Sequence, residues 1–289
     1  MLKVADGLLG VRTSRLKDAS RAPLAGPRRK PAAAAPGHLS RRWAIDESIV
    51  AGRSITTLTP RDWGQEVTVV YLHGGAYVAD LLAAHWTIVD NLARETGASV
   101  VIPSYGLAPE HTVDEAFEFV TAVVAGVRRR RPTGRVYLAG DSAGGGLALA
   151  LALEMRGSAL RPDGLFLFSP WVDATLSNPE ARRVETIDPM LGIDWLRYWG
   201  EKWAGARSTT DPRVSPVLGD LGDLPPTWVY QGGRDLFRPD AERFAADARA
   251  AGSPVEITVY PDGFHVFVAL AAAPESRAVY REIRRVLRA

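Results

Sequence analysis

The sequence contains no cysteine, and this absence excludes several kinds of chemistry. Among its 289 residues no thiol is present to form a disulfide, to act as a nucleophile or to ligate a metal. Histidine is also scarce, with five residues, so an imidazole base has few candidates.

Long apolar runs are missing as well. None reaches the roughly 18 residues that a membrane-spanning helix requires. Near the N-terminus, Asp6 and Arg12 interrupt anything that resembles the apolar region of a signal peptide. We therefore expect a cytoplasmic protein. Because 46% of the residues are apolar and 24% are charged, we expect one sizeable globular domain with a large core.

The net charge is small but unevenly distributed. The whole chain carries +2, whereas residues 1–42 contain ten Lys or Arg and two Asp, which is +8 and leaves −6 for the rest. This basic segment is rich in Pro and Ala, a composition typical of a solvated, mobile linker. An arm for nucleic acid or for an anionic membrane surface is the less favoured alternative, and we expect no nucleic-acid partner.

Short apolar or β-branched runs alternate with helix-length segments along the chain. The predicted strands are 53–58, 67–72, 98–102, 135–139, 164–168, 227–230 and 255–259. The predicted helices are 85–96, 113–130, 143–155, 239–251 and 274–287. This alternation indicates an α/β fold, with a mostly parallel central sheet flanked by helices. No helix separates the first two strands, which predicts an antiparallel edge, and residues 171–224 indicate an insertion.

One strand-to-helix junction carries a serine between glycines. The motif G-D-S-A-G at 140–144 connects a predicted strand to a helix rich in Ala and Leu. A serine nucleophile must project its hydroxyl from a sharp turn, and glycines two residues away on each side let the strand and helix backbones pass closely. The helix N-terminus also favours the negative charge that develops there. We predict that Ser142 is a nucleophile.

A second motif, H-G-G-A-Y at 73–77, directly follows a predicted core strand. Acyl transfer produces a negative oxygen, and each preorganised backbone N–H aimed at it contributes about 10²–10³ in rate. Two consecutive glycines permit this close approach, although a simple tight turn is the alternative interpretation. We predict an oxyanion hole formed by the N–H groups of Gly74, Gly75 and Ala143, with His73 as a structural hydrogen-bonding residue.

These motifs resemble the hormone-sensitive lipase family of bacterial carboxylesterases, within the α/β-hydrolase superfamily. The likeness covers the chain from about Val67 to its end, through S-Y-G-L-A-P-E-H at 104–111, S-P-W-V-D at 169–173, D-P-R-V-S-P at 211–216 and G-G-R-D at 232–235. It implies an α/β-hydrolase domain at 43–289 with a helical cap inserted at about 172–210. It also implies that part of residues 1–42, at 1–17, adds to the cap. One departure is Gly106, where the family has Arg in Y-R-L-A-P-E, and it concerns the packing and ion pairing of that loop.

The order of residues along the chain selects the base and the acid. In α/β hydrolases both follow the nucleophile, and His265 is the one histidine after Ser142. Asp235 follows a predicted strand directly, and the family pattern also selects it. Asp240 is a competitor, but the proline before it indicates a carboxylate at the start of a helix. Asp262 is close to His265 in sequence but needs a contorted turn to reach the ring.

Together these residues predict a serine carboxylesterase for short to medium acyl or aryl esters. His265 takes the proton of Ser142, Asp235 supports the imidazolium, and an acyl-enzyme intermediate forms. The partner is a small ester, with no cofactor and no metal. An amidase or lactonase with the same triad is the alternative, as is a non-catalytic receptor on the same fold, which the complete triad argues against. The oligomeric state is left open, a homodimer included.

Four aromatic residues fall within the predicted insertion. Trp195, Tyr198, Trp199 and Trp203 recur at spacings that place them on one face of a helix. This face either packs on the core or, as the resemblance implies, belongs to a cap helix that lines an apolar pocket over the nucleophile. On the second interpretation, Tyr77, Trp195 and Trp199 are predicted to bind substrate.

Overall fold

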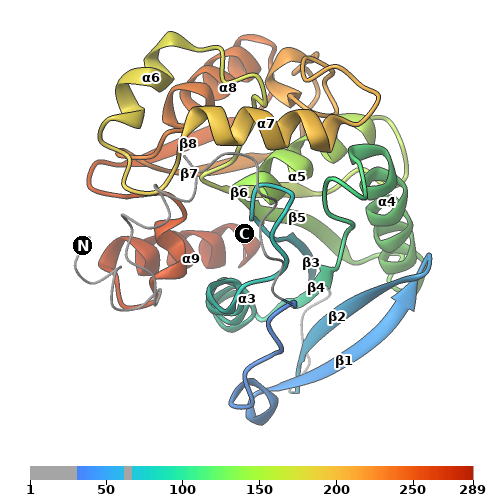
Figure 1. Ribbon diagram of the computed structural model, residues 1–289. Coiled ribbons are helices and arrows are strands. Elements are labelled where there is room, and N and C mark those ends of the chain that lie inside the picture. The colour runs from blue at the N-terminus through green and yellow to red at the C-terminus, as the bar shows by residue number, and fades with distance from the viewer. Residues whose placement is uncertain (1–30, 62–66, 289) are drawn as a thin grey trace.

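The computed structural model describes residues 31–61 and 67–288 and contains one eight-stranded sheet (Figure 1). The strand order is β1-β2-β4-β3-β5-β6-β7-β8. All neighbouring pairs from β4 to β8 are parallel, whereas β2 is antiparallel to both β1 and β4. The strands are β1 (Trp43–Val50), β2 (Arg53–Pro60), β3 (Val67–Leu72), β4 (Ser99–Pro103), β5 (Arg135–Asp141), β6 (Gly164–Phe168), β7 (Thr227–Gly232) and β8 (Val255–Tyr260).

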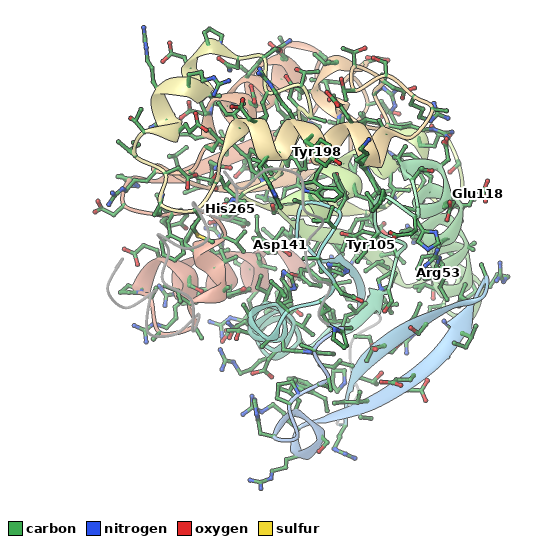
Figure 2. All side chains as sticks on the ribbon, viewed as in Figure 1. Arg53, Tyr105, Glu118, Asp141, Tyr198 and His265 are labelled. Carbon is green, nitrogen blue, oxygen red and sulfur yellow. The ribbon has the colours of Figure 1, made fainter. Side chains whose placement is uncertain are left out.

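The α/β class and the antiparallel edge predicted from the sequence are confirmed, with two corrections at that edge. Strand β1 was not among the predicted strands, because Asp46 and Glu47 interrupt its apolar pattern. It is an edge strand, and charged side chains on such a strand discourage pairing with other chains. In addition, β4 lies between β2 and β3, so the first two predicted strands do not pair. Arg53, labelled in Figure 2, begins β2.

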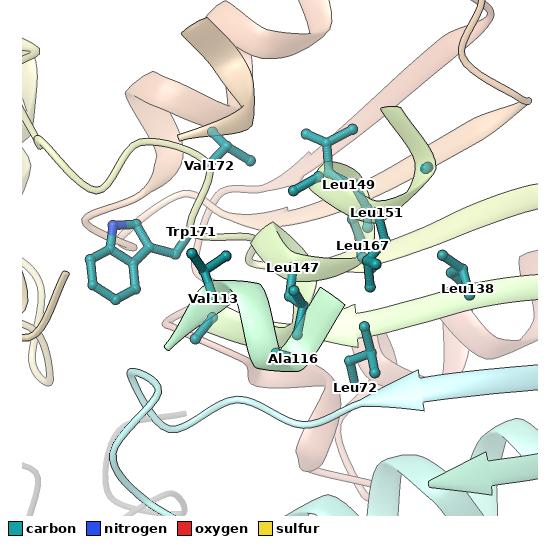
Figure 3. Close-up of a cluster of buried hydrophobic side chains, with 14 of the residues drawn as sticks. Leu72, Val113, Ala116, Leu138, Leu147, Leu149, Leu151, Leu167, Trp171 and Val172 are labelled. Carbon is teal, nitrogen blue, oxygen red and sulfur yellow. The ribbon is translucent and has the colours of Figure 1, made fainter. Parts of the chain in front are cut away.

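Helices cover both faces of the sheet because its strands are apolar on both sides. Along β3, Val70 and Leu72 contribute to one buried cluster, while Val69 and Tyr71 contribute to the other. Helices α4, α5 and α8 pack on the first cluster, part of which Figure 3 shows, and α3 and α9 pack on the second. The helices are α3 (Ala83–Thr96), α4 (Val113–Arg130), α5 (Ala143–Glu154), α8 (Arg238–Ala250) and α9 (Pro274–Arg288).

The predicted insertion between β6 and β7 carries two further helices, α6 (Pro179–Glu185) and α7 (Ile193–Ala204), which form the upper layer in Figure 1. Helix α7 approaches the segment after β6 closely at Gly200, where a Cβ atom would lie 3.2 Å from Ala174 Cβ and 3.5 Å from the Trp171 ring. The backbone N–H of Trp171 donates to the Ser142 carbonyl at 2.9 Å. Helix α7 therefore packs on the segment whose backbone is hydrogen-bonded to the predicted nucleophile.

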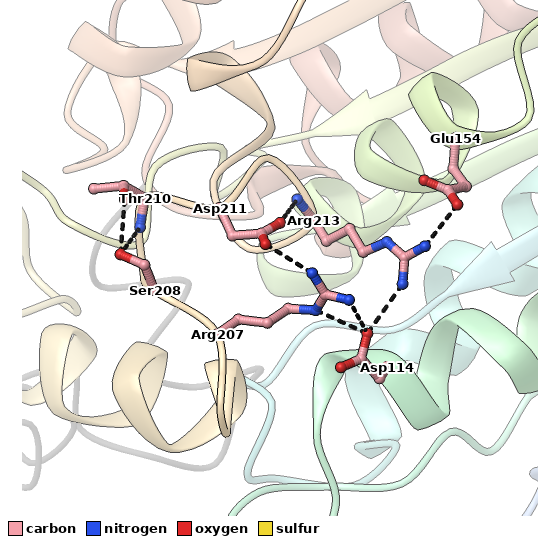
Figure 4. A network of polar contacts seen from close by, with 7 residues as sticks. All are labelled: Asp114, Glu154, Arg207, Ser208, Thr210, Asp211 and Arg213. Carbon is pink, nitrogen blue, oxygen red and sulfur yellow. Dashed lines mark hydrogen bonds and ion pairs between the residues drawn. The ribbon is translucent and has the colours of Figure 1, made fainter.

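A network of ion pairs attaches the chain after α7 to the body (Figure 4). Arg207 pairs with Asp114 of α4 and with Asp211, both at 2.7 Å. Arg213 pairs with the same Asp114 at 3.0 Å and with Glu154 of α5 at 2.6 Å. An isolated pair of this exposure contributes about 0–1 kcal/mol, but shared partners order the side chains together. The network fixes the return of the insertion to the sheet.

The end of the basic N-terminal segment packs against the body. The Ala33 N–H donates to Leu81 O at 2.7 Å, and Trp86 Nε1 donates to Ala33 O at the same distance. The side chain of Leu39 is fully buried. The interpretation as a mobile linker is therefore wrong for residues 31–42. The remainder, including the predicted cap piece at 1–17, lies outside the described residues. No helix in the described ranges is both long and apolar enough to cross a membrane.

Candidate active site

Ser142 occupies the sharp turn between β5 and α5. Its φ of 52° and ψ of −123° are rare for a residue with a side chain, so the surrounding structure must hold this conformation. The Ser142 N–H donates to Phe168 O at 2.9 Å, which secures the turn to β6. A Cβ atom at position 144 would lie 2.0 Å from Leu72 O, so only glycine fits there. This local geometry is that of a nucleophile elbow.

The structure brings the three predicted triad residues together. His265 Nε2 lies 2.9 Å from Ser142 Oγ, and His265 Nδ1 lies 3.0 Å from Asp235 Oδ2. The exposed fractions are 6% for Ser142, 5% for His265 and 0% for Asp235. The Phe237 N–H donates to Asp235 Oδ1 at 3.0 Å, which orients the carboxylate. With its proton on Nδ1, the ring directs the lone pair of Nε2 to the serine hydroxyl.

The two competing carboxylates lie elsewhere. Asp240 stands in the first turn of α8 and accepts a hydrogen bond from Asn178 Nδ2 at 3.0 Å. Burial raises the pKa of Asp240 to about 6. Asp262 is exposed. Of the three candidate carboxylates, Asp235 is the one hydrogen-bonded to His265.

The electrostatics of the site favour a protonated imidazole during the reaction. Burial by itself would lower the pKa of His265, but the charge and hydrogen bond of Asp235 outweigh it, and the net pKa is raised. Asp188 and Asp141 contribute in the same direction. A base with a raised pKa accepts a proton from serine more readily.

The loop after β3 differs from the prediction at Gly74. Its N–H donates to Asp141 Oδ1 at 3.0 Å, so this group is not available to an oxyanion. Gly74 instead permits close contact, since a Cβ atom there would lie 2.3 Å from Asp141 Oδ2. The N–H groups of Gly75 and Ala76 donate to no acceptor within 31–61 and 67–288. Ala143 is the first residue of α5, where an N–H has no acceptor inside the helix.

Asp141 is a residue that our sequence reasoning missed. Its carboxylate accepts from the Tyr71 hydroxyl at 2.5 Å as well as from Gly74. The Leu82 N–H donates to His85 Nδ1 at 2.8 Å, so the His85 proton is on Nε2, 3.5 Å from Asp141 Oδ2. Burial tends to raise the pKa of Asp141, but these partners lower it, so the carboxylate stays ionised. The sequence signal that could have identified Asp141 is its position directly before the serine in G-D-S-A-G.

His73 is buried and plays no direct part in the triad. Its Nδ1 donates to Gly74 O at 2.8 Å, and its ring stacks on Tyr105 with a centroid separation of 4.6 Å. Burial and the neighbouring His85 lower the pKa of His73 to about 4. The Tyr105 hydroxyl donates to His73 O at 2.6 Å. This neutral ring is a structural support for the loop after β3.

Beside the loop that contains Gly106, a guanidinium is supplied by Arg53 of β2 and not by the loop itself. Arg53 Nη2 lies 2.9 Å from His111 Nδ1 and 3.5 Å from Glu115 Oε2. A Cβ atom at position 106 would lie 2.5 Å from the His111 ring and 2.6 Å from Arg53 Nη2. The space beside Gly106 is therefore already filled, and the ion pair next to this loop joins Arg53 of β2 to Glu115 of α4.

The aromatic face of α7 points to the body. Trp203 stacks on Tyr77 of the loop after β3 with a centroid separation of 4.1 Å, and Tyr77 also stacks on Trp171. Trp199 is buried, whereas Trp195 is half-buried. The helix therefore covers the loop after β3 while leaving two large aromatic residues, Trp195 and Tyr198, partly accessible. Among the described residues, no cluster of three His, Cys, Asp or Glu side chains could hold a metal ion.

Comparisons with known proteins agree with this geometry. Residues 69–269 match the family described as alpha/beta hydrolase fold. An esterase of Acinetobacter venetianus is 32% identical over 223 residues, which cover 74% of this chain and 72% of the relative. An acetyl-hydrolase of Streptomyces hygroscopicus is 33% identical over 203 residues, covering 69% and 68%. The crystal structure of a hormone-sensitive lipase from a metagenome library has a TM-score of 0.82 at 27% identity, over 96% of both chains.

An elbow serine beside a histidine and an aspartate, on a mostly parallel sheet, defines the class of α/β hydrolases. The chain belongs to the hormone-sensitive lipase family within this class and is a carboxylic-ester hydrolase.

Proposed function

We propose that Ser142 is the nucleophile of a double-displacement ester hydrolysis in which His265 is the base. His265 accepts the serine proton while the oxygen attacks the ester carbonyl, and it then protonates the departing alcohol. Asp235 keeps the ring in the reactive tautomer and stabilises the imidazolium. Water repeats the cycle on the acyl-enzyme. The observation that carries this proposal is the unbroken line of hydrogen-bond contacts from Ser142 through His265 to Asp235.

We assign the oxyanion to the N–H groups of Gly75, Ala76 and Ala143. The first two belong to the loop that Asp141 holds through Gly74, and the third belongs to the elbow. The positive φ angles of Gly75 (118°) and Ala76 (53°) depart from regular backbone and support a loop shaped for a ligand. Donors fixed before the reaction need no reorganisation when the charge develops.

The substrate is an ester with a short to medium acyl chain or a compact aryl group. Trp195, one of the two half-buried aromatic residues of α7, is our candidate for a wall of the acyl pocket, beside Tyr77 and Trp199. The relative named an acetyl-hydrolase supports the short end of this range.

The cytoplasmic location stays a prediction.

A series of p-nitrophenyl esters tests this substrate range. We expect kcat/KM to rise over the first few carbons, because each buried methylene contributes about 0.8 kcal/mol, and to fall once the pocket is full. Trp195→Ala should move the optimum to longer chains. Trp199→Ala is the matched comparison: this side chain is buried, so its loss should lower the free energy of unfolding by about 3–5 kcal/mol.

An optimum at sixteen or eighteen carbons in the unmodified enzyme would contradict the enclosed pocket. An unchanged optimum in Trp195→Ala would remove that residue from the pocket wall. Matched p-nitroanilides in the same series decide between ester and amide hydrolysis, and we expect the esters to react faster.

A further inference from the structure

The connection between α6 and α7 places a third buried carboxylate beside the triad. Asp188 is 1% exposed, although it belongs to the insertion and not to the sheet. Its Oδ2 accepts the N–H of Leu236 at 2.7 Å, and Leu236 directly follows Asp235. Its Oδ1 accepts the N–H groups of Met190 and Leu191 at 2.6 and 2.9 Å. One side chain therefore connects the start of α7 to the loop of the catalytic acid.

The loop of Asp235 is fixed by two carboxylates at successive residues. Asp188 holds the N–H of Leu236, and Asp235 itself holds the N–H of Phe237. The Phe237 ring in turn contacts His265 edge to face, with centroids 5.2 Å apart. Loss of the first bond removes the side-chain restraint on the backbone directly after Asp235, while the Arg238 N–H still donates to Asp235 O at 3.0 Å. The 3.0 Å contact between Asp235 and His265 depends on that backbone.

Asp188 also adds charge to the site. Burial and the nearby Asp235 raise the pKa of Asp188 to about 6, so the carboxylate is mostly ionised at neutral pH. His265 is then faced by three negative groups: Asp235 from the loop after β7, Asp188 from the insertion and Asp141 from the end of β5. All three favour the imidazolium. Figure 2 labels His265 and Asp141, beneath α7 in that view.

We propose that Asp188 is a positioning residue for the triad, which orients Asp235 through the Leu236 N–H and stabilises the imidazolium of His265 by its charge. The proposal rests on the triad mechanism given above. It makes the packing of α7 a condition for full activity, because the same carboxylate holds the N–H groups that lead into this helix.

The test is Asp188→Asn, which keeps the shape of the side chain but removes the charge and one acceptor. We expect kcat to fall by about 10- to 100-fold, the range typical of a misplaced catalytic group, with KM changed by less than about threefold. We also expect the acid limb of the pH profile of kcat/KM to move to lower pH. Removal of a negative charge lowers the pKa of His265, and only the neutral ring is a base.

Asp240→Asn is the matched control. Asp240 is as buried as Asp188, and burial raises its pKa to about 6. Its carboxylate, however, accepts a hydrogen bond from Asn178 and not from the loop of Asp235. This variant should keep the kcat and the acid limb of the unmodified enzyme. A residue with a merely structural role would change the thermal midpoint and the yield of folded enzyme, but not the pH profile.

Asp188→Glu covers the case in which Asp188→Asn does not fold. It retains the charge with a longer reach, so kcat should fall while the acid limb stays in place. Unchanged kcat and acid limb in Asp188→Asn, or unchanged kcat in Asp188→Glu, would overturn the proposal. Active-site titration with a fluorophosphonate, run on the same samples, distinguishes failure of the Asp188 proposal from failure of the triad mechanism. If the unmodified enzyme does not react at Ser142, the triad mechanism itself is refuted.

Discussion

Replacement of Ser142 by alanine is expected to lower kcat for p-nitrophenyl esters by about 10⁴- to 10⁶-fold. The reason is that no other hydroxyl is hydrogen-bonded to His265 Nε2 in the described structure. Alanine fits the elbow with little change in volume, although the φ of 52° remains strained for it. The measurement is steady-state kinetics beside a thermal unfolding curve.

Ser177→Ala is a suitable control, since Ser177 is exposed in the insertion and should retain full activity. A folded Ser142→Ala enzyme with turnover near that of the unmodified protein would exclude Ser142 as the nucleophile. The residual rate should not depend on His265, because the base then has no serine proton to remove.

Asp235→Asn is expected to lower kcat by about 10⁴-fold. The Phe237 N–H donates to Oδ1 of the native carboxylate, so the asparagine carbonyl will take that place and present its NH₂ to His265 Nδ1. The ring must then accept at Nδ1 and carry its proton on Nε2, which is the unreactive tautomer. The effect is therefore on kcat and not on KM.

The pH profile gives a second measurement of the same change. In the unmodified enzyme, kcat/KM should rise with pH through an ionisation above about 6.5, because Asp235 raises the pKa of His265. Activity is present above that pKa and is lost as the pH falls through it. In Asp235→Asn the midpoint should move to lower pH. An unchanged midpoint together with an unchanged kcat would show that another carboxylate orients the ring.

The sequence predicted most of the fold because its strands and helices have strong local signals. The helix 113–130 has the bounds of α4, and the strand 67–72 has those of β3. Ser142 could be identified because glycines flank it at a strand-to-helix turn, and His265 because the base follows the nucleophile in the chain order of this fold. These features are determined by residues that are close together in the sequence, so a local pattern is enough to predict them.

What the sequence did not predict depends on contacts between distant residues. The role of Gly74 depends on Asp141, 67 positions further along, whose carboxylate takes the N–H that we had assigned to the oxyanion. Asp188 meets Leu236 across 48 positions. β1 is an edge strand whose charges hide its pattern. No local pattern records such pairings.

The most direct test of the account is the identification of the residue that becomes covalently modified. The enzyme is treated with a fluorophosphonate, digested and analysed by mass spectrometry, with His265→Ala treated in parallel. We predict one equivalent of label on Ser142, at the centre of G-D-S-A-G, and much slower labelling in His265→Ala. Label on another residue, or none on Ser142 in a folded enzyme that hydrolyses esters, would contradict the account.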